Sequence, residues 1–234
     1  LGELERIEVL KGPQGTVFGK NTSAGVINVV TRRPDYETSA EGELTFGNYG
    51  AVGAAGSFNS ALGESAAFRV YGAKRKRDGF SEVRTGEGPR RETEDGDQNF
   101  HTLRGQLLFE PSDRLDIRLS GDFTSREENC CVGMTVVRGA TARIIDALAT
   151  DEGVVPVADP FARVAYSNRS TEQDIKDKGV AAHLDWITPW FGEATLTSIS
   201  AWREWGSING LDFDFSSADI LYRNPEKDES FTGF

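Results

Sequence analysis

From about Ala40 onward, apolar and polar residues alternate along the chain in segments of about ten residues. The clearest segment is 115–124, where apolar residues and glycine occupy the odd positions and polar residues the even ones. The same period of two recurs around 42–46, 68–70, 103–110 and 180–186, and a less regular segment lies around 51–59. Because successive side chains of a strand point to opposite faces, the pattern predicts half-exposed antiparallel strands. A seventh extended segment, 193–205, has two faces too similar to be assigned.

The connections between these segments differ in length in a regular way. Short connections are interleaved with long polar ones, which fall at 78–98, 126–174 and 206–229, and the first hairpin turns tightly at 47–50. The short connections are 60–65, 111–114 and 188–192. Successive connections of an up-and-down meander lie at opposite ends of the sheet. Outer-membrane barrels have this asymmetry, with short periplasmic turns and long external loops, so the pattern predicts an antiparallel all-β membrane barrel.

A soluble β-sandwich is the main alternative, because it also alternates apolar and polar positions. Its outward faces need no aromatic residues beside the short turns. Here several aromatics stand within a few residues of such turns: Phe109, Trp186, Trp190 and Phe191. An interfacial aromatic girdle belongs at this height of a membrane barrel. The pattern therefore favours the barrel over the sandwich.

The stretch 1–34 is built differently. A short apolar run at 7–10 and a second one at 26–30 flank a segment with four glycines within fourteen residues, Gly12, Gly15, Gly19 and Gly25. Glycines at that density mark sharp turns or close backbone approach. The stretch therefore predicts a small, tightly folded α+β unit.

The run 4–34, LERIEVLKGPQGTVFGKNTSAGVINVVTRRP, resembles the second half of the plug domain of TonB-dependent receptors at nearly every position. Two later segments, 114–120 and 194–203, are more weakly similar to early barrel strands of that family. The resemblance implies a large barrel, of about 22 strands when complete, with a small α+β plug inside. Residues 1–35 would then be the C-terminal half of the plug and 36–234 the first part of the barrel, with about seven strands. The coupling segment, the first half of the plug and the later strands are expected to lie beyond this chain.

For the motif residues, the resemblance implies structural and gating roles rather than substrate contact. The glycines are expected at tight turns, and the charged side chains can pair with the polar barrel wall. The residues are Arg6, Glu8, Lys11, Gly12, Gly15, Gly19, Asn21, Gly25, Arg32 and Arg33.

The resemblance also implies active uptake of a scarce substrate across the outer membrane of a Gram-negative bacterium, with a ferric siderophore as the first choice. The expected partners are TonB, which would use the proton gradient to rearrange the plug, the small-molecule substrate and the lipid bilayer. A passive outer-membrane channel is one alternative, although a porin has no folded stopper before its barrel. A soluble or surface β-sandwich adhesin is the other.

Composition excludes several other classes of function. The net charge of -11 argues against nucleic acid, whose phosphates require a basic surface. Two histidines and two cysteines make a zinc, haem or iron–sulfur site improbable. No nucleophile–base–acid set emerges, so we expect no enzyme, no metal and no cofactor. No stretch approaches the 18 or so consecutive apolar residues of a transmembrane helix.

Two clusters in the long connections could carry chemistry. Cys130 and Cys131 are adjacent, and each can bond to the other in a strained ring or reach a partner elsewhere. Asp212, Asp214 and Asp219 offer oxygen ligands at a spacing usable by Ca²⁺. For the aspartates, a solvated acidic loop is the favoured interpretation.

Overall fold

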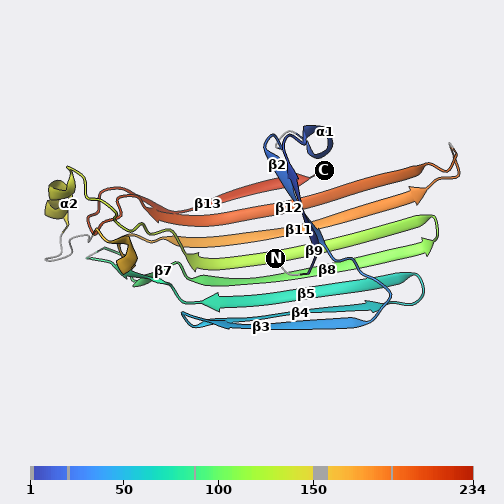
Figure 1. The fold of residues 1–234 in the computed structure, drawn as a ribbon, viewed down its shortest axis with the longest axis horizontal. Coiled ribbons are helices and arrows are strands. Elements are labelled where there is room, and N and C mark those ends of the chain that lie inside the picture. The colour runs from blue at the N-terminus through green and yellow to red at the C-terminus, as the bar shows by residue number, and fades with distance from the viewer. Residues whose placement is uncertain (1–2, 20–21, 87, 150–157, 191, 234) are drawn as a thin grey trace.

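The computed structural model describes residues 3–19, 22–86, 88–149, 158–190 and 192–233. Most of them form one antiparallel sheet of long strands (Figure 1). The sheet strands are β3 (Ser39–Gly47), β4 (Ala51–Ala61), β5 (Ala66–Arg77), β8 (Gln98–Ser112), β9 (Leu115–Asn129), β11 (Glu172–Ile187), β12 (Thr195–Asp212) and β13 (Tyr222–Gly233). Their order in the sheet, β13-β12-β11-β9-β8-β5-β4-β3, follows the chain, as in the predicted meander.

The register of the strands separates an apolar face from a polar one. Leu119 of β9 lies opposite Leu107 of β8 and Ala182 of β11. Directly opposed residues point to the same face, so the odd positions of 115–123 share an apolar face with their neighbours. Arg118, on the other face, pairs with Asp185 at 3.1 Å. This confirms the facing predicted from the alternation in β9.

Strand pairing also assigns the segment that the sequence left open. Trp202 of β12 lies opposite Val180, which places it on the apolar face. Arg203 points the other way and reaches Asp177 at 2.6 Å and Asp122 at 3.1 Å. The local pattern is ambiguous here because Ile199 shares the polar face with Arg203.

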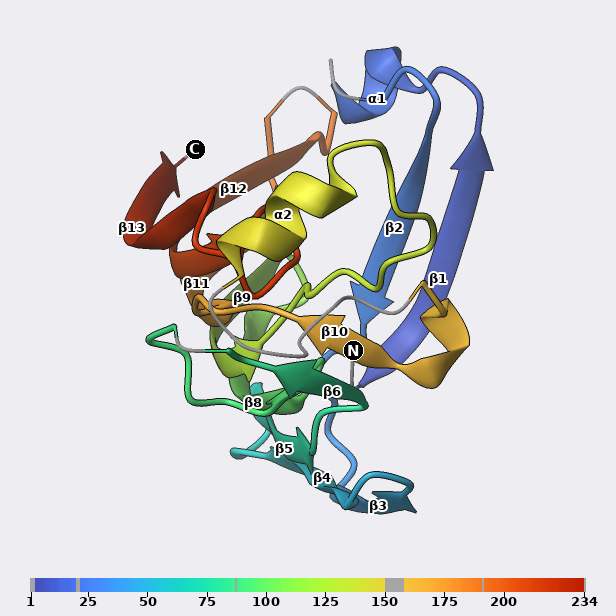
Figure 2. The same cartoon turned by 90° about the vertical axis from the view of Figure 1, so that its left-hand side faces the viewer.

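The sheet is curved, and Figure 2 shows β1 (Leu4–Lys11) and β2 (Gly25–Thr31) on its concave side. The concave face is the polar one. The convex face exposes its large side chains; Leu103 is 61% exposed and Val180 58%. Among the described residues no second sheet covers this apolar surface, so the β-sandwich alternative is wrong. None of the described helices is long and apolar enough to cross a bilayer.

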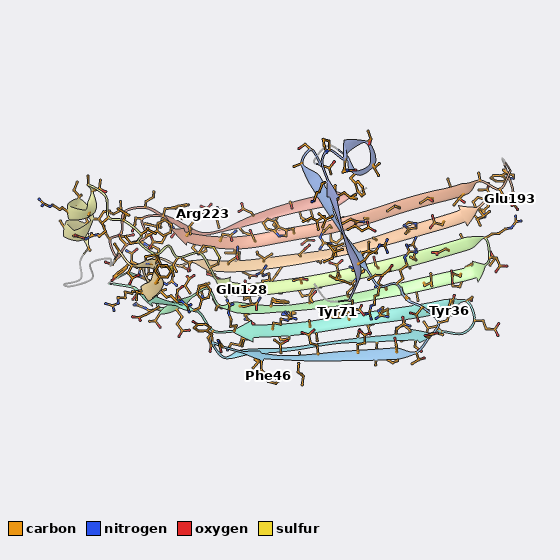
Figure 3. All side chains as sticks on the ribbon, in the orientation of Figure 1. Tyr36, Phe46, Tyr71, Glu128, Glu193 and Arg223 are labelled. Atoms are coloured by element: carbon orange, nitrogen blue, oxygen red, sulfur yellow. A yellow bond between two sulfur atoms is a disulfide. The ribbon has the colours of Figure 1, made fainter. Side chains whose placement is uncertain are left out.

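The turns 62–65, 113–114 and 188–194 lie at one end of the sheet, and the long connections lie at the other together with the tight turn between β3 and β4 (Figure 1). Figure 3 shows Glu193 at the short-turn end and Glu128 near the loop end. At the loop end, β10 (Val164–Tyr166), β6 (Ser81–Arg84) and β7 (Glu94–Asp95) form a small sheet in that order, which the sequence did not indicate. The helices α2 (Ala142–Leu148) and η1 (Pro160–Ala162) belong to the same region.

The last connection is shorter than predicted. In place of a loop at 206–229, β12 continues to Asp212 and β13 begins at Tyr222. Gly210 and Pro225 look like loop residues in sequence, but they meet at a break in register between Asn209 and Leu211. Bulges are where a strand tolerates proline and glycine. The sheet therefore has eight strands, not about seven, and the longest connection runs 130–171 instead of 126–174.

Candidate functional site: the wall of the lumen and the loop mouth

The motif run forms a hairpin that crosses the concave face. β1 and β2 pair antiparallel, with Val9 opposite Ile27, and the turn between them contains the short helix α1 (Gly15–Phe18). Figure 1 shows this hairpin lying across the long strands rather than along them.

At Gly12, Gly19 and Gly25 the backbone conformation requires glycine, whereas at Gly15 it does not. Gly25 has φ of 150°, and a Cβ there would lie 2.7 Å from the Leu10 carbonyl oxygen. Gly12 and Gly19 also have positive φ, as expected of turn residues. Gly15 begins α1, and a Cβ there would meet nothing, so its predicted role as a tight turn is wrong. Asn21 lies outside the described residues.

Two charged motif residues, Arg6 and Glu8, form their contacts within the hairpin. Arg6 pairs with Glu5 and Glu8 of its own strand rather than with the described strands of the sheet. The Arg6 guanidinium, and then the Asn28 amide at 2.8 Å, hold the pKa of the Glu8 carboxyl below its usual range. The partners of Glu8 among the described residues are therefore within the hairpin.

Arg32 does reach the wall. It forms an ion pair with Glu41 of β3, and its carbonyl oxygen accepts a hydrogen bond from Gln106 Nε2 at 2.9 Å. Among the described residues, Lys11 and Arg33 form no ion pair, so their predicted pairing with the wall is not found.

The most buried contacts between the hairpin segment and the sheet come from residues that the sequence did not single out. Glu3 pairs with Arg69 of β5 at 2.6 Å, and both side chains are 4% exposed. Asn59 of β4 is fully buried and donates to the carbonyl oxygens of Asp35 and Glu37. For Arg69 and Asn59, the signal in the sequence was their position on the polar face of β5 and β4.

At the short-turn end, a further bond ties the linker to the sheet. Tyr36 donates to Glu110 Oε2 at 2.7 Å, and this carboxylate, together with partial desolvation, raises the pKa of Tyr36 to about 12. These contacts hold the two ends of the hairpin segment, at Glu3 and at 32–37, against the concave wall.

At the loop end, a buried polar network joins three connections. Arg90 and Asp95, 0% and 1% exposed, pair at 3.0 Å. Thr171 Oγ1 accepts from Arg90 at 2.8 Å and donates to Asp95. Asp212 accepts from Ser167 Oγ at 2.9 Å. A buried pair with such additional hydrogen bonds fixes the relative positions of the segments that carry it.

In the last connection, the carboxylates of Asp214 and Asp219 are bound by protein groups through hydrogen bonds and an ion pair. Asp214 accepts from the backbone N–H groups of Ile220 and Leu221, while Asp219 pairs with Arg169. Arg169 holds the pKa of the Asp219 carboxyl below its usual range. No group of three or more potential metal ligands occurs in the described part of the chain.

Cys130 and Cys131 form a disulfide with each other. Together with Met134 they line a recess at the loop end, whose other walls include Arg77 and Arg126 from the polar face of the sheet. The recess therefore lies where the concave wall meets the long connections.

The chain is similar to known proteins over parts of its length. No protein-family model matches it. It is 36% identical over 75 residues to the ferrioxamine receptor of Yersinia enterocolitica, covering 32% of this chain and 11% of that protein. It is 28% identical over 144 residues to an iron-regulated outer membrane virulence protein of Vibrio cholerae, covering 55% of this chain and 20% of that protein.

Among solved structures, the ferric-catecholate import receptor Fiu of E. coli K12 superposes with a TM-score of 0.65 at 12% identity, covering 99% of this chain and 34% of that one. At that identity the likeness concerns the fold alone. The chain thus spans about a tenth to a fifth of the curated relatives it matches, and about a third of the solved one. The plug-like hairpin and the curved meander agree with these comparisons: the chain is similar in sequence to parts of a ferrioxamine receptor and of an iron-regulated outer membrane protein, and in fold to a ferric-catecholate import receptor.

Proposed function

We propose that the receptor of which this chain is a part takes up a ferric siderophore across the outer membrane, driven by TonB. The observation that carries the proposal is the hairpin segment held against the polar concave wall by the buried Glu3–Arg69 pair. A wide barrel needs a folded stopper, and a stopper fixed by ion pairs can be released by a mechanical pull. The names of the relatives, a ferrioxamine receptor among them, support the substrate class.

In this proposal, residues 1–35 are the C-terminal half of the plug and 36–234 the first part of the barrel. The polar concave face becomes the lumen wall, and the apolar convex face meets lipid. The long connections at 78–97 and 130–171 are external, so the recess beside Cys130 and Cys131 opens toward arriving substrate. We expect binding and transport without chemical conversion of the substrate.

Uptake of radioactive iron by cells that carry the full-length receptor tests this function. Iron-starved cells should accumulate iron from its siderophore, and deletion of TonB or addition of a proton uncoupler should abolish uptake while leaving surface binding intact. The passive-channel alternative predicts uptake that survives both treatments. It also predicts an open pore in planar bilayers, where a plugged receptor should conduct little.

A further inference from the structure

The disulfide between adjacent cysteines coincides with an uncommon backbone conformation. Cys131 has a φ of 85°, in the left-handed region that favours glycine over residues with a side chain. The bond to Cys130 closes a small ring that contains the peptide bond between the two residues. The ring restrains the rotation of Cys131, so opening the disulfide removes a restraint on a conformation that the residue does not favour by itself.

The residues on either side of Cys131 are anchored unequally to the buried network at the loop end. The Cys130 N–H donates to the carbonyl oxygen of Thr171 at 2.9 Å. The Val132 N–H donates to Asp95 Oδ1 over the longer distance of 3.4 Å. Longer hydrogen bonds are weaker, so a rotation at Cys131 would break the second contact first. Such a rotation therefore redirects the chain that follows residue 131 and leaves the end of β9 in place.

The segment that follows, 132–139, separates two recesses. Met134 lines the recess beside the disulfide on one side, and on the other side it lines a second recess together with Val136 and Phe215. Gly133 approaches Phe215 so closely that a Cβ at residue 133 would lie 2.9 Å from the aromatic ring. The direction of the chain at Cys131 therefore determines the shape of both recesses.

The disulfide is accessible from the surrounding solution. Cys131 is exposed and Cys130 is half-buried, at the loop end that faces the viewer in Figure 2. Disulfides exchange by attack of a thiolate on one of the two sulfur atoms, and access to that sulfur is one of the factors that set the rate. The exposed sulfur of Cys131 meets this requirement.

We propose that Cys130 and Cys131 form a site of thiol–disulfide exchange with a small thiol, and that reduction redirects the segment 132–139. A thiolate attacks Cys131 Sγ, the S–S bond breaks, and Cys130 leaves as a thiolate that takes up a proton. A second thiol molecule then attacks the mixed disulfide and releases Cys131. Two thiols are thereby oxidised to one disulfide, while the cysteine pair gains two electrons and two protons.

The exchange site depends neither on the siderophore nor on TonB. The proposed function adds that the recess opens to the outside, so the thiol comes from the medium. Reduction then changes the shape of the recess that arriving substrate meets first. The site is therefore a means by which the redox state of the medium regulates the mouth of the receptor.

Treatment of the purified full-length receptor with millimolar glutathione, without denaturant, tests the site. Alkylation and mass spectrometry should find two free thiols at positions 130 and 131, or one thiol and one glutathione adduct. Amide hydrogen exchange in peptides from 132–149 should become about tenfold faster, which corresponds to about 1.4 kcal/mol. Peptides from β9 should exchange as before.

Two variants separate the backbone conformation from the disulfide itself. Cys130→Ala with Cys131→Gly removes the disulfide, but glycine adopts a positive φ readily, so the segment 132–149 should exchange like the oxidised parent. Cys130→Ala with Cys131→Ala also removes the disulfide and disfavours the positive φ, so it should exchange like the reduced parent. Neither variant should respond to glutathione.

Three outcomes would overturn the proposal. These are a disulfide that stays intact under native conditions, reduction that leaves exchange in 132–149 unchanged, and equal exchange in the glycine and alanine variants. Unchanged heat modifiability verifies that the variants fold. Siderophore binding is measured on the same samples. A receptor that binds no siderophore in either redox state counts against the proposed function and leaves the result for the exchange site intact.

Discussion

At the scale of single residues, the contacts that hold the hairpin to the wall are few and deeply buried. Glu3 and Arg69 are both shielded from water, so the charge of each side chain is compensated by the other. By contrast Arg75, six residues further along the same face of β5, pairs with Glu43 where both side chains remain substantially exposed. Breaking a buried pair leaves an uncompensated charge, whereas an exposed pair exchanges its partner for water.

Replacing Arg69 by Met should therefore destabilise the folded receptor by about 3–5 kcal/mol and expose the hairpin to protease. Arg75→Met is the matched control and should cost under about 1 kcal/mol. The measurements are thermal unfolding of the purified receptor and limited proteolysis. Adding Glu3→Gln to Arg69→Met should restore much of the loss; no difference between the Arg69 and Arg75 variants would show that the buried pair does not hold the segment.

Gly25 provides a second test at this scale. Gly25→Ala places a Cβ 2.7 Å from the Leu10 carbonyl oxygen at a φ that side chains rarely adopt, so we expect a loss of about 1–3 kcal/mol. Gly15→Ala adds a Cβ in open space within α1 and should be neutral or slightly stabilising. The stability of both variants is measured from the midpoint of unfolding. An equal response of the two variants would contradict the hairpin geometry.

At the scale of elements, each long strand has one lipid face and one lumen face, and a step of one residue changes the solvent. β9 shows this most clearly, because Leu119 is 44% exposed on the apolar face while Ser120 belongs to the polar one. The consequence is that neighbouring residues should respond oppositely to the same substitution.

Leu119→Arg should cost about 2–4 kcal/mol near the membrane midplane, because the charge enters hydrocarbon. Ser120→Arg should be mild for folding, since it adds a charge to a lumen wall that already holds ion pairs. The assay is the folded, heat-modifiable fraction in lipid vesicles across a urea titration. Comparable losses at both positions would require a different register for β9.

At the scale of the whole molecule, the small sheet and the buried Arg90 network gather the long connections into one body at one end. The other end carries short turns and aromatic residues, among them Trp186 and Trp190, whose ring centroids are 5.6 Å apart. Phe191, the remaining aromatic of that turn, lies outside the described residues. The proposed function places the loop end outside the cell and the turn end in the periplasm.

Labelling of intact cells tests this orientation. A membrane-impermeant maleimide should react with Arg91→Cys, on an exposed loop position, and not with Asp113→Cys, in a short turn. The parent receptor is the control, since Cys130 and Cys131 are joined in a disulfide. Reaction at 113 without reaction at 91 would reverse the topology.

The sequence by itself determined what depends on local period and on a specific motif. The alternation in 115–124 set the two faces of β9, the lengths of the connections set which end carries the loops, and the run 4–34 indicated the family. Tertiary structure decided what depends on pairing between distant segments. The facing of Trp202 follows from Val180 on the next strand, and the continuation of β12 through Gly210 follows from its register with β13. Likewise Glu3 contacts Arg69, and Arg90 contacts Thr171, through pairing of segments far apart in the sequence. The alternation along one strand shows which face a side chain is on, but not which distant residue it contacts.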